Sequence, residues 1–273
     1  MTRLKTPLEV YTLLPKSNCG ECGTATCMAF AAAIIKQEKQ LDDCPHLDAE
    51  TLSRHGGNIE QQVNLEKIQE IMFRDLQEQI KTIDIAACAE RLGARRTGSS
   101  IAVTCLGKDF EVDREGRVLS SCHSHAWFSI PLLTYVLYSK GVPVSGRWVP
   151  FRELEQGSKW GPLFERRCEV PLKQIADSHA ELFEDLISMF SGSSSPDRFS
   201  SDIAVLLYPL PKVPMLICYW KPEDGMGSKL HVFFDDTAEQ NLTLDSLFTL
   251  GTGLVRMLEK IMLAHTDGKS GLS

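Results

Sequence analysis

The sequence lacks the features that mark three large classes of protein. No apolar run approaches the eighteen or more residues that a membrane-spanning helix needs. The N-terminal stretch MTRLKTPLEVYTLL has no signal-peptide core and no cleavage site. The net charge is −7, and the chain has no basic stripe with interleaved aromatic residues, which argues against nucleic acid as the main partner. We therefore expect a cytoplasmic protein with no membrane span and no nucleic-acid partner.

Familiar catalytic motifs are also absent. The chain has no Gly-x-Gly-x-x-Gly, no Walker loop, no His-Glu-x-x-His and no Gly-x-Ser-x-Gly elbow. No residue is therefore predicted as a catalytic acid, base or nucleophile, and whether the protein is an enzyme stays open. The small basic cluster of Arg91, Arg95 and Arg96 is predicted to be a solvated helix face.

Cysteine, by contrast, is abundant, with nine residues in 273. Without an export signal, this content favours metal binding or redox chemistry over disulfides. Three of the thiols lie in the segment KSNCGECGTATC, and the full spacing is Cys19-x2-Cys22-x4-Cys27-x16-Cys44. Four thiols on one short segment can close a metal site.

Three kinds of site use cysteines in such patterns. Structural zinc sites usually present two Cys-x2-Cys pairs, and here the second pair is missing. A redox dithiol at Cys-Gly-Glu-Cys would leave two cysteines unexplained, and no βαβ pattern surrounds it. A cubane presents four irons, so its ligands need not come as two pairs, and a Cys-Pro step also ends the bacterial ferredoxin motif. The pattern favours an iron–sulfur cluster, with zinc and a dithiol as the alternatives.

The same residues resemble a known family. The segment TPLEVYTLLPKSNCGECGTATCMAFAAAIIKQEKQLDDCPHLDAE is similar to the [4Fe–4S] domain at the N-terminus of the large subunit of the corrinoid iron–sulfur protein. It is also similar to the cluster domain of the B subunit of Rnf-type electron-transport complexes. The resemblance covers about fifty of the 273 residues. It implies that Cys19, Cys22, Cys27 and Cys44 are the four cluster ligands, and that low-potential electrons reactivate an oxidised cobalt corrinoid.

The rest of the chain departs from both families. It is too short for the TIM-barrel-like domain of the corrinoid protein, and no cysteine-rich ferredoxin repeats follow. The segments SIPLLTYVLYSKGVPVSGRWVPFREL and YPLPKVPMLICYWKPED resemble an uncharacterised domain family of anaerobic bacteria and archaea, which implies no known activity. We expect a [4Fe–4S] cluster domain at 1–56, an α+β domain of unknown function at 57–268 and a disordered tail at 269–273.

Periodicity predicts an α+β fold, with a small helical domain followed by a larger one with a mainly antiparallel sheet. In the first domain, a helix capped at Thr6-Pro7 precedes the cysteine loop, a second helix covers 25–40, and residues 48–58 form a boundary. The larger domain is predicted to have helices at 59–80, 85–92, 125–141, 175–190 and 243–263, and strands within 100–120 and at 202–210, 214–220 and 229–235.

Other polar residues have both a functional and a structural interpretation. The Cys-His-Ser-His run at 122–125 could bind a second metal, although polar residues at a helix N-terminus are the simpler interpretation. Asp235 and Asp236 follow a strand and could bind a cation, although a turn with solvated acids is preferred. The remaining cysteines in apolar contexts are predicted to be buried small hydrophobic residues: Cys88, Cys105, Cys168 and Cys218.

A short acidic–histidine motif invites comparison with corrinoid-binding domains. Asp177 and His179 stand as in an Asp-x-His-x-x-Gly loop, but Leu182 replaces the glycine and no strand precedes the motif. A solvent-facing helical histidine is therefore the preferred interpretation.

Two functions follow from these observations. The leading hypothesis is an iron–sulfur redox protein of anaerobic metabolism, which relays electrons from a [4Fe–4S] cluster to a partner protein or a bound cofactor. A corrinoid is the cofactor that the resemblance suggests, and a redox protein or a corrinoid protein is the expected partner. The alternative is a protein that binds or delivers a corrinoid or another metallocofactor, with a cluster that is reductive or structural. The cofactor-binding residues of the larger domain are unknown.

Overall fold

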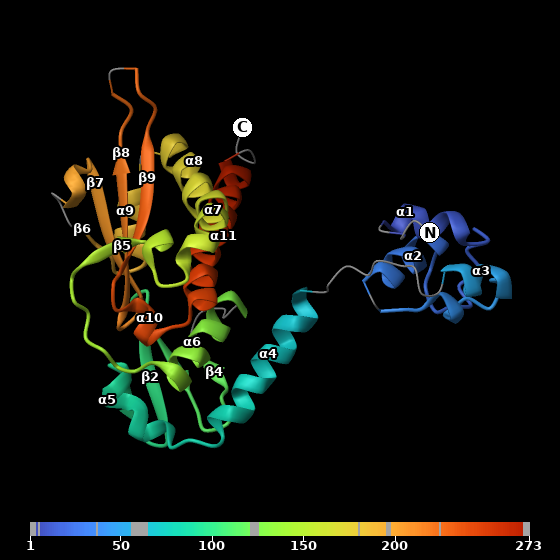
Figure 1. Cartoon of the computed structure of the whole chain (residues 1–273), viewed down its shortest axis with the longest axis horizontal. Coiled ribbons are helices and arrows are strands. Elements are labelled where there is room, and N and C mark those ends of the chain that lie inside the picture. The colour runs from blue at the N-terminus through green and yellow to red at the C-terminus, as the bar shows by residue number, and fades with distance from the viewer. Residues whose placement is uncertain are drawn as a thin grey trace. The chain divides into compact units, whose positions relative to one another are not determined.

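The computed structural model describes residues 4, 6–36, 38–55, 65–120, 126–179, 181–194, 198–223 and 225–269. The chain divides into two compact units, Met1–Ile71 and Met72–Ser273. Each unit has its own apolar core, one formed between residues 4 and 52 and the other beginning at Leu76. The fold is α+β, as predicted: a small helical unit is followed by a larger one with antiparallel sheets (Figure 1).

The N-terminal unit is built from short helical elements. These are α1 (Pro7–Leu13), α2 (Cys27–Ile35), the 3₁₀ turn η1 (Leu41–Asp43) and α3 (Ala49–His55). The predicted cap of α1 is confirmed, because the backbone N–H of Glu9 donates to Thr6 Oγ1 at 3.3 Å and the N–H of Thr6 donates to Glu9 Oε2 at 3.0 Å. Val10 of α1 and Phe30 of α2 are buried in the small core.

Two details of this unit differ from expectation. The helix predicted at 25–40 is shorter, because the N–H of Glu38 bonds to the carbonyl of Ala33 at 2.9 Å and turns the chain out of α2. Part of the segment predicted as a boundary is helical instead. Asp48 starts α3 by accepting hydrogen bonds from the N–H of Thr51 at 2.7 Å and from its hydroxyl at 2.8 Å, as an N-cap residue does.

Helix α4 (Leu65–Ile80) spans the division between the units, and a small antiparallel meander follows it. The elements that come next are η2 (Ile85–Cys88), α5 (Ala89–Leu92), β1 (Arg95–Thr97), β2 (Ser100–Cys105), β3 (Lys108–Val112) and β4 (Val118–Leu119). The four strands pair in the order β1-β2-β3-β4. Strands β2, β3 and β4 lie within the segment 100–120 where strands were predicted, whereas β1 was not predicted.

The basic cluster of this region is not a solvated helix face, contrary to expectation. Arg91 of α5 is half-buried, and its guanidinium donates to the carbonyl of Val136 at 2.8 Å and to that of Ser139. These carbonyls lie at the end of α6 (Ala126–Tyr138), where helix carbonyls lack partners of their own. Arg95 and Arg96 lie on β1 instead.

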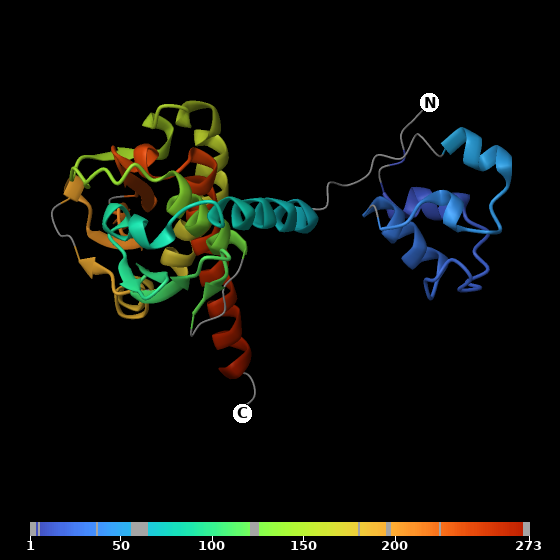
Figure 2. The ribbon, with the colours of Figure 1, turned by 90° about the horizontal axis from the view of Figure 1, so that it is seen from below.

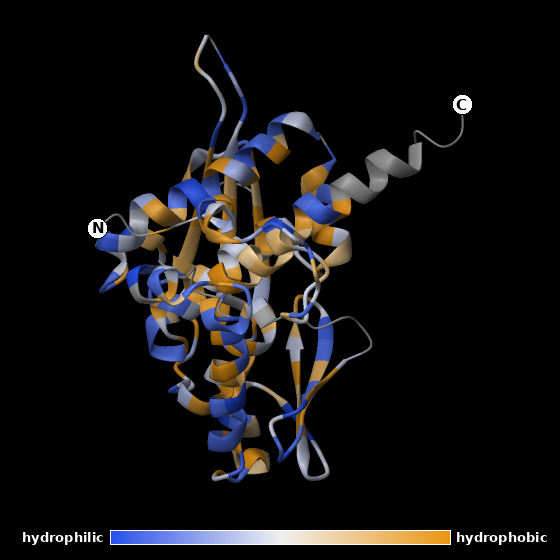
Figure 3. Ribbon diagram, turned by 90° about the vertical axis from the view of Figure 1, so that its right-hand side faces the viewer, coloured by the Kyte–Doolittle hydropathy of each residue, from blue (hydrophilic) through white to orange (hydrophobic). Residues whose placement is uncertain are grey.

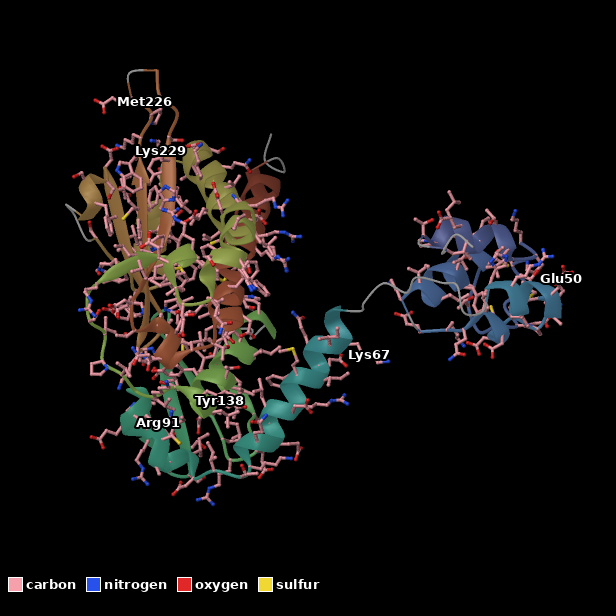
Figure 4. The ribbon with its side chains drawn as sticks, viewed as in Figure 1. Glu50, Lys67, Arg91, Tyr138, Met226 and Lys229 are labelled. Atoms are coloured by element: carbon pink, nitrogen blue, oxygen red, sulfur yellow. The ribbon has the colours of Figure 1, made fainter. Side chains whose placement is uncertain are left out.

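The larger sheet has five antiparallel strands in the order β5-β9-β8-β7-β6 (Figure 1). Their bounds are β5 (Trp148–Pro150), β6 (Ser193–Ser194), β7 (Ile203–Leu210), β8 (Val213–Trp220) and β9 (Lys229–Asp235). The three long strands are those predicted from the sequence. The loop between β8 and β9 extends beyond the sheet, and Met226 lies there, 64% exposed (Figure 4).

Helices cover one face of this sheet (Figures 1 and 2). They are α7 (Gly157–Phe164), the π-helical segment η4 (Glu165–Glu169), α8 (Val170–Ser178), α9 (Leu182–Met189) and α11 (Leu244–Lys269), with the 3₁₀ turn η3 (Phe151–Glu153). The short helix α10 (Ala238–Asn241) follows β9. The 3₁₀ turn η5 (Arg198–Ser200) lies on the other face, where Phe199 stacks on Phe233. Apolar and polar residues alternate along the helices, as expected where one helix face is buried (Figure 3). The helix predicted at 175–190 is broken at His179, and α7 and η4 were not predicted.

A buried acid holds the irregular segment 139–147 against the end of β9. Asp235 is fully buried, and its carboxylate accepts hydrogen bonds from the backbone N–H groups of Ser145 at 3.1 Å and Gly146 at 2.7 Å. The preferred interpretation of Asp235 as a solvated acid is therefore wrong. Asp236 is half-buried and pairs with Arg147 at 2.6 Å, so both acids already have partners within the chain.

The predicted domain boundary after residue 56 falls among residues 56–64, outside the described residues, and we propose to test it by truncation. A chain of residues 58–273 should unfold cooperatively in urea, because its core is complete. A chain of residues 81–273 should lose at least about 2 kcal/mol, because it lacks the buried Leu76 and Ile80 of α4. The absence of a cooperative transition in the longer chain would contradict the boundary.

Candidate metal centre

The loop between α1 and α2 has an unusual backbone. Four of its residues have positive φ, at 60° for Lys16, 51° for Asn18, 76° for Gly20 and 80° for Gly23. Positive φ is easy for glycine, but it is uncommon for a lysine and tolerated by asparagine. The N–H of Gly23 bonds to the carbonyl of Gly20 at 2.9 Å and closes a tight turn. The chain therefore curls tightly in the segment that carries the first three cysteines.

The four predicted ligands differ in exposure. Cys27 is the first residue of α2 and Cys44 follows η1, and both are 7% exposed. Cys22 is half-buried and Cys19 is exposed. Two thiols thus belong to the core of the unit and two lie at its surface. In the described part of the chain every cysteine is free of a disulfide.

Asn18 and Cys27 form a reciprocal pair of hydrogen bonds. The backbone N–H of Cys27 donates to Asn18 Oδ1 at 2.8 Å, and the N–H of Asn18 points back to Cys27 Sγ at 3.4 Å. The first bond satisfies one of the free N–H groups at the start of α2. The second offers a hydrogen-bond donor to the sulfur.

A hydroxyl lies beside a second cysteine. Thr24 Oγ1 is 3.1 Å from Cys22 Sγ and 3.3 Å from the carbonyl oxygen of Thr26. A hydroxyl has one hydrogen to donate. When Cys22 is a thiolate it has no hydrogen of its own, so Thr24 must be the donor if that contact is to remain a hydrogen bond.

A group of three possible metal ligands at the exposed end of the loop was not predicted from the sequence. Among the residues that the structure describes, the ligand atoms of Cys19, Glu21 and His46 lie within 4.8 Å of one another. His46 Nε2 is 3.1 Å from Glu21 Oε2, and both side chains are about half exposed, at 46% and 57%. Two features of the sequence could have indicated this group: the glutamate within Cys-Gly-Glu-Cys and the histidine after Cys44-Pro45. The other three predicted ligands are not part of this close group.

The remaining candidates from the sequence belong to the larger unit. Residues 122–125 lie outside the described residues. Three apolar-context cysteines are buried as predicted, at 0–1% exposure, while Cys88 is half-buried. Burial raises the pKa of Cys168 and Cys218, so both favour the neutral thiol.

The Asp177–His179 motif has a structural explanation. Asp177 accepts hydrogen bonds from Tyr219 Oη at 2.8 Å and from Ser228 Oγ at 2.5 Å, and pairs with Lys173 at 2.7 Å. Burial alone would raise the pKa of Asp177, but these donors outweigh burial and hold the pKa below its usual value. The acid ties α8 to strand β8 and the β8–β9 loop. His179 is exposed at the end of α8, as expected.

A carboxylate of the π-helical segment closes the free edge of β9. Glu169 is only 8% exposed, and its Oε1 accepts the backbone N–H of Val232 at 2.9 Å. Strand β5 pairs with residues 233–235 of β9, so the N–H of Val232 lies just beyond that pairing. His231 Nδ1 is 3.5 Å from Glu169 Oε2. The Glu169 carboxylate raises the pKa of His231 above 6.5, against the opposing effect of burial.

This pair predicts a pH dependence of stability. A histidine whose folded-state pKa is raised stabilises the fold fully below its unfolded pKa of about 6.5, and this contribution is lost as the pH rises through the folded value. Replacing His231 by Gln should therefore lower the urea midpoint more at pH 6 than at pH 8.5. Replacing the exposed His179 by Gln is the control, and an equal loss at both pH values in H231Q would contradict the prediction.

The chain matches two family models. Residues 84–257, more than half of the chain, match the family described as "Domain of unknown function (DUF3786)". The chain belongs to this family. Residues 14–46 match the family described as "Putative Fe-S cluster", and this segment contains all four predicted ligand cysteines. Both resemblances inferred from the sequence are confirmed.

Curated relatives match the N-terminal part of this DUF3786 protein. The acetyl-CoA decarbonylase/synthase complex subunit gamma of Methanothermobacter thermautotrophicus is 56% identical over 45 residues, which is 16% of this chain and 10% of that protein. The corrinoid/iron-sulfur protein large subunit of Moorella thermoacetica is 55% identical over 42 residues, 15% of this chain and 9% of that protein. The chain thus spans about a tenth of the length of these relatives. No solved structure matches the chain.

The iron–sulfur segment of this chain is thus similar to part of a protein named as a corrinoid/iron-sulfur protein subunit. Within the described part of the chain, no helix has both the length and the apolar character required to cross a membrane.

Proposed function

We propose that the protein is a redox protein in which Cys19, Cys22, Cys27 and Cys44 hold a [4Fe–4S] cluster that passes electrons to a partner. The observation that carries the proposal is the iron–sulfur family match over residues 14–46, which spans the four cysteines. A cluster of this kind supplies one-electron transfer at a potential that hydrogen bonds to the sulfurs and solvent exposure adjust. The residues around the loop determine both of these influences.

The donor set fits an iron–sulfur cluster better than zinc. All four residues are free thiols on one small unit, and thiolates are the ligands that such clusters use. A tetrahedral zinc site with Zn–S bonds of about 2.3 Å would hold its sulfurs roughly 3.8 Å apart. The group with ligand atoms within 4.8 Å of one another combines Cys19 with Glu21 and His46, and not with the other cysteines. The sequence spacing, which has no second Cys-x2-Cys pair, also departs from the usual pattern of a structural zinc site.

The exposure of the loop supports electron exchange at the surface. Cys27 and Cys44 anchor the site in the core, while Cys19 and Cys22 lie at or near the surface. A partner can therefore approach from the side of Cys19. The name of the Moorella thermoacetica relative, corrinoid/iron-sulfur protein large subunit, suggests a corrinoid protein as that partner. We propose that the transfer takes place in the cytoplasm, as part of anaerobic metabolism. A titration with cobalamin distinguishes this proposal from the alternative of a corrinoid carrier, since tight binding without electron transfer would favour the carrier.

Substitutions can distinguish a site formed by the four cysteines from one formed by Cys19, Glu21 and His46. Replacing Cys22 by Ala should abolish the brown colour and the content of about four irons and four sulfides per chain in anaerobically prepared protein. It should also loosen the N-terminal unit, because metal binding supplies folding energy in small units. The double variant Glu21→Gln, His46→Asn should keep the full iron and sulfide content. Loss of iron in the double variant, or a single bound zinc in the unaltered protein, would contradict the proposal.

Thr24 should adjust the reduction potential. Replacing Thr24 by Val removes the hydroxyl beside Cys22 Sγ, and the loss of a donor should make the potential more negative, because the donor favours the more negatively charged reduced state. A net hydrogen bond of about 1 kcal/mol corresponds to roughly 40 mV for one electron, which is the upper limit we expect. Thr24→Ser keeps the hydroxyl and is the matched control. A potentiometric titration that shows equal shifts in both variants would reject this role.

A further inference from the structure

A cavity of about 350 Å³ in the DUF3786 region is lined by three arginines. Arg166 and Arg167 come from η4, and Arg256 comes from α11. A cavity of this size lies within the range of small-molecule sites. Arg256 is far in sequence from the adjacent Arg166 and Arg167. The packing of α11 beside the π-helical segment brings the three arginines together.

The arginines have no partners within the described part of the chain. All three are exposed, and none takes part in the hydrogen bonds or ion pairs found among these residues. Glu259 is the acid of the cavity lining, so the lining carries two net positive charges. Such a concentration of positive charge is notable on a chain whose net charge is −7.

A local irregularity of the helix presents two of the arginines. Pro171 has no N–H to donate to the carbonyl of Arg167 four residues earlier. The chain accommodates this with a π-helical segment, in which the N–H of Val170 bonds to the carbonyl of Glu165. The wider turn reduces the angle between successive side chains, so Arg166 and Arg167 can line one cavity. Such π-helical segments are frequent at functional sites.

Most of the remaining lining is apolar, with Thr252 and Glu259 as its polar members. Phe248 and Leu163 are half-buried there, and Val255 is 1% exposed. Trp160 is not part of the lining, but it packs edge-on against Phe248, with ring centroids 5.6 Å apart. An occupant of this cavity would therefore meet guanidinium groups and an aromatic surface together.

We propose that this cavity binds a small phosphate monoester with an aromatic or aliphatic body. A phosphate monoester carries up to two negative charges, which match the charge of the lining. Guanidinium groups bind phosphate oxygens in pairs, and their planar geometry suits that contact better than an ammonium group. The apolar wall would bind the organic part. The site is independent of the cysteine loop.

The proposal can be tested by calorimetry with phenyl phosphate as the probe and the full chain as the receptor. We expect one binding site, an affinity that falls as salt rises, and weaker binding of inorganic phosphate, which lacks the ring. Replacing Arg256 by Gln should weaken phenyl phosphate binding about tenfold or more, as the loss of a charge-assisted hydrogen bond would. Glu259→Gln should tighten binding, because it removes the opposing charge.

The matched control replaces Arg114, an exposed arginine of the β3–β4 turn, by Gln. Binding in R114Q should be unchanged, and both variants should keep the thermal transition and the iron content of the unaltered protein. Absence of phenyl phosphate binding, or equal weakening in R256Q and R114Q, would overturn the site. Equal affinity for inorganic phosphate, or tighter binding of benzoate, would overturn the assignment to a phosphate monoester with an apolar body.

Discussion

The reciprocal hydrogen bonds between Asn18 and Cys27 are the constraint on which the N-terminal unit depends. They join the start of the cysteine loop to the first residue of α2, so the loop between them must close on itself. The positive φ angles of Asn18, Gly20 and Gly23 are the backbone solution to that closure. The same contact places Cys27, a predicted cluster ligand, at the start of α2. The two hydrogen bonds between Asn18 and Cys27 therefore set both the shape of the loop and the position of a predicted ligand.

The small core of the N-terminal unit explains how a bound metal centre would add to its stability. Its apolar cluster has few members, and two of them, Cys27 and Cys44, are predicted ligands. A core this small supplies little stability by itself. Bonds from the thiolates to a metal centre would link the loop, α2 and the turn after η1 at the point where apolar contacts are fewest. The surface position of Cys19 leaves one side of the site open to a partner.

In the larger unit, the corresponding interaction closes a part of strand β9 that has no neighbouring strand. Glu169 satisfies Val232 where β5 no longer pairs with β9, and the π-helical segment that positions Glu169 also presents Arg166 and Arg167. A buried carboxylate needs such donors, because an unpaired charge in the core is costly. The structural role of η4 and the proposed anion site thus arise from the same irregular turn, whose origin lies in Pro171.

Features that depend on neighbouring residues could be predicted from the amino-acid sequence alone. The Thr6–Glu9 cap, the three long strands and the four-cysteine spacing all have local signatures, since caps, alternation and ligand spacing act within a few residues. Features that depend on residues far apart in the chain became visible only in the tertiary structure. The burial of Asp235, the contact of Glu169 with Val232 and the convergence of Arg256 on η4 have no local signature, because each arises only when segments far apart in the chain pack together.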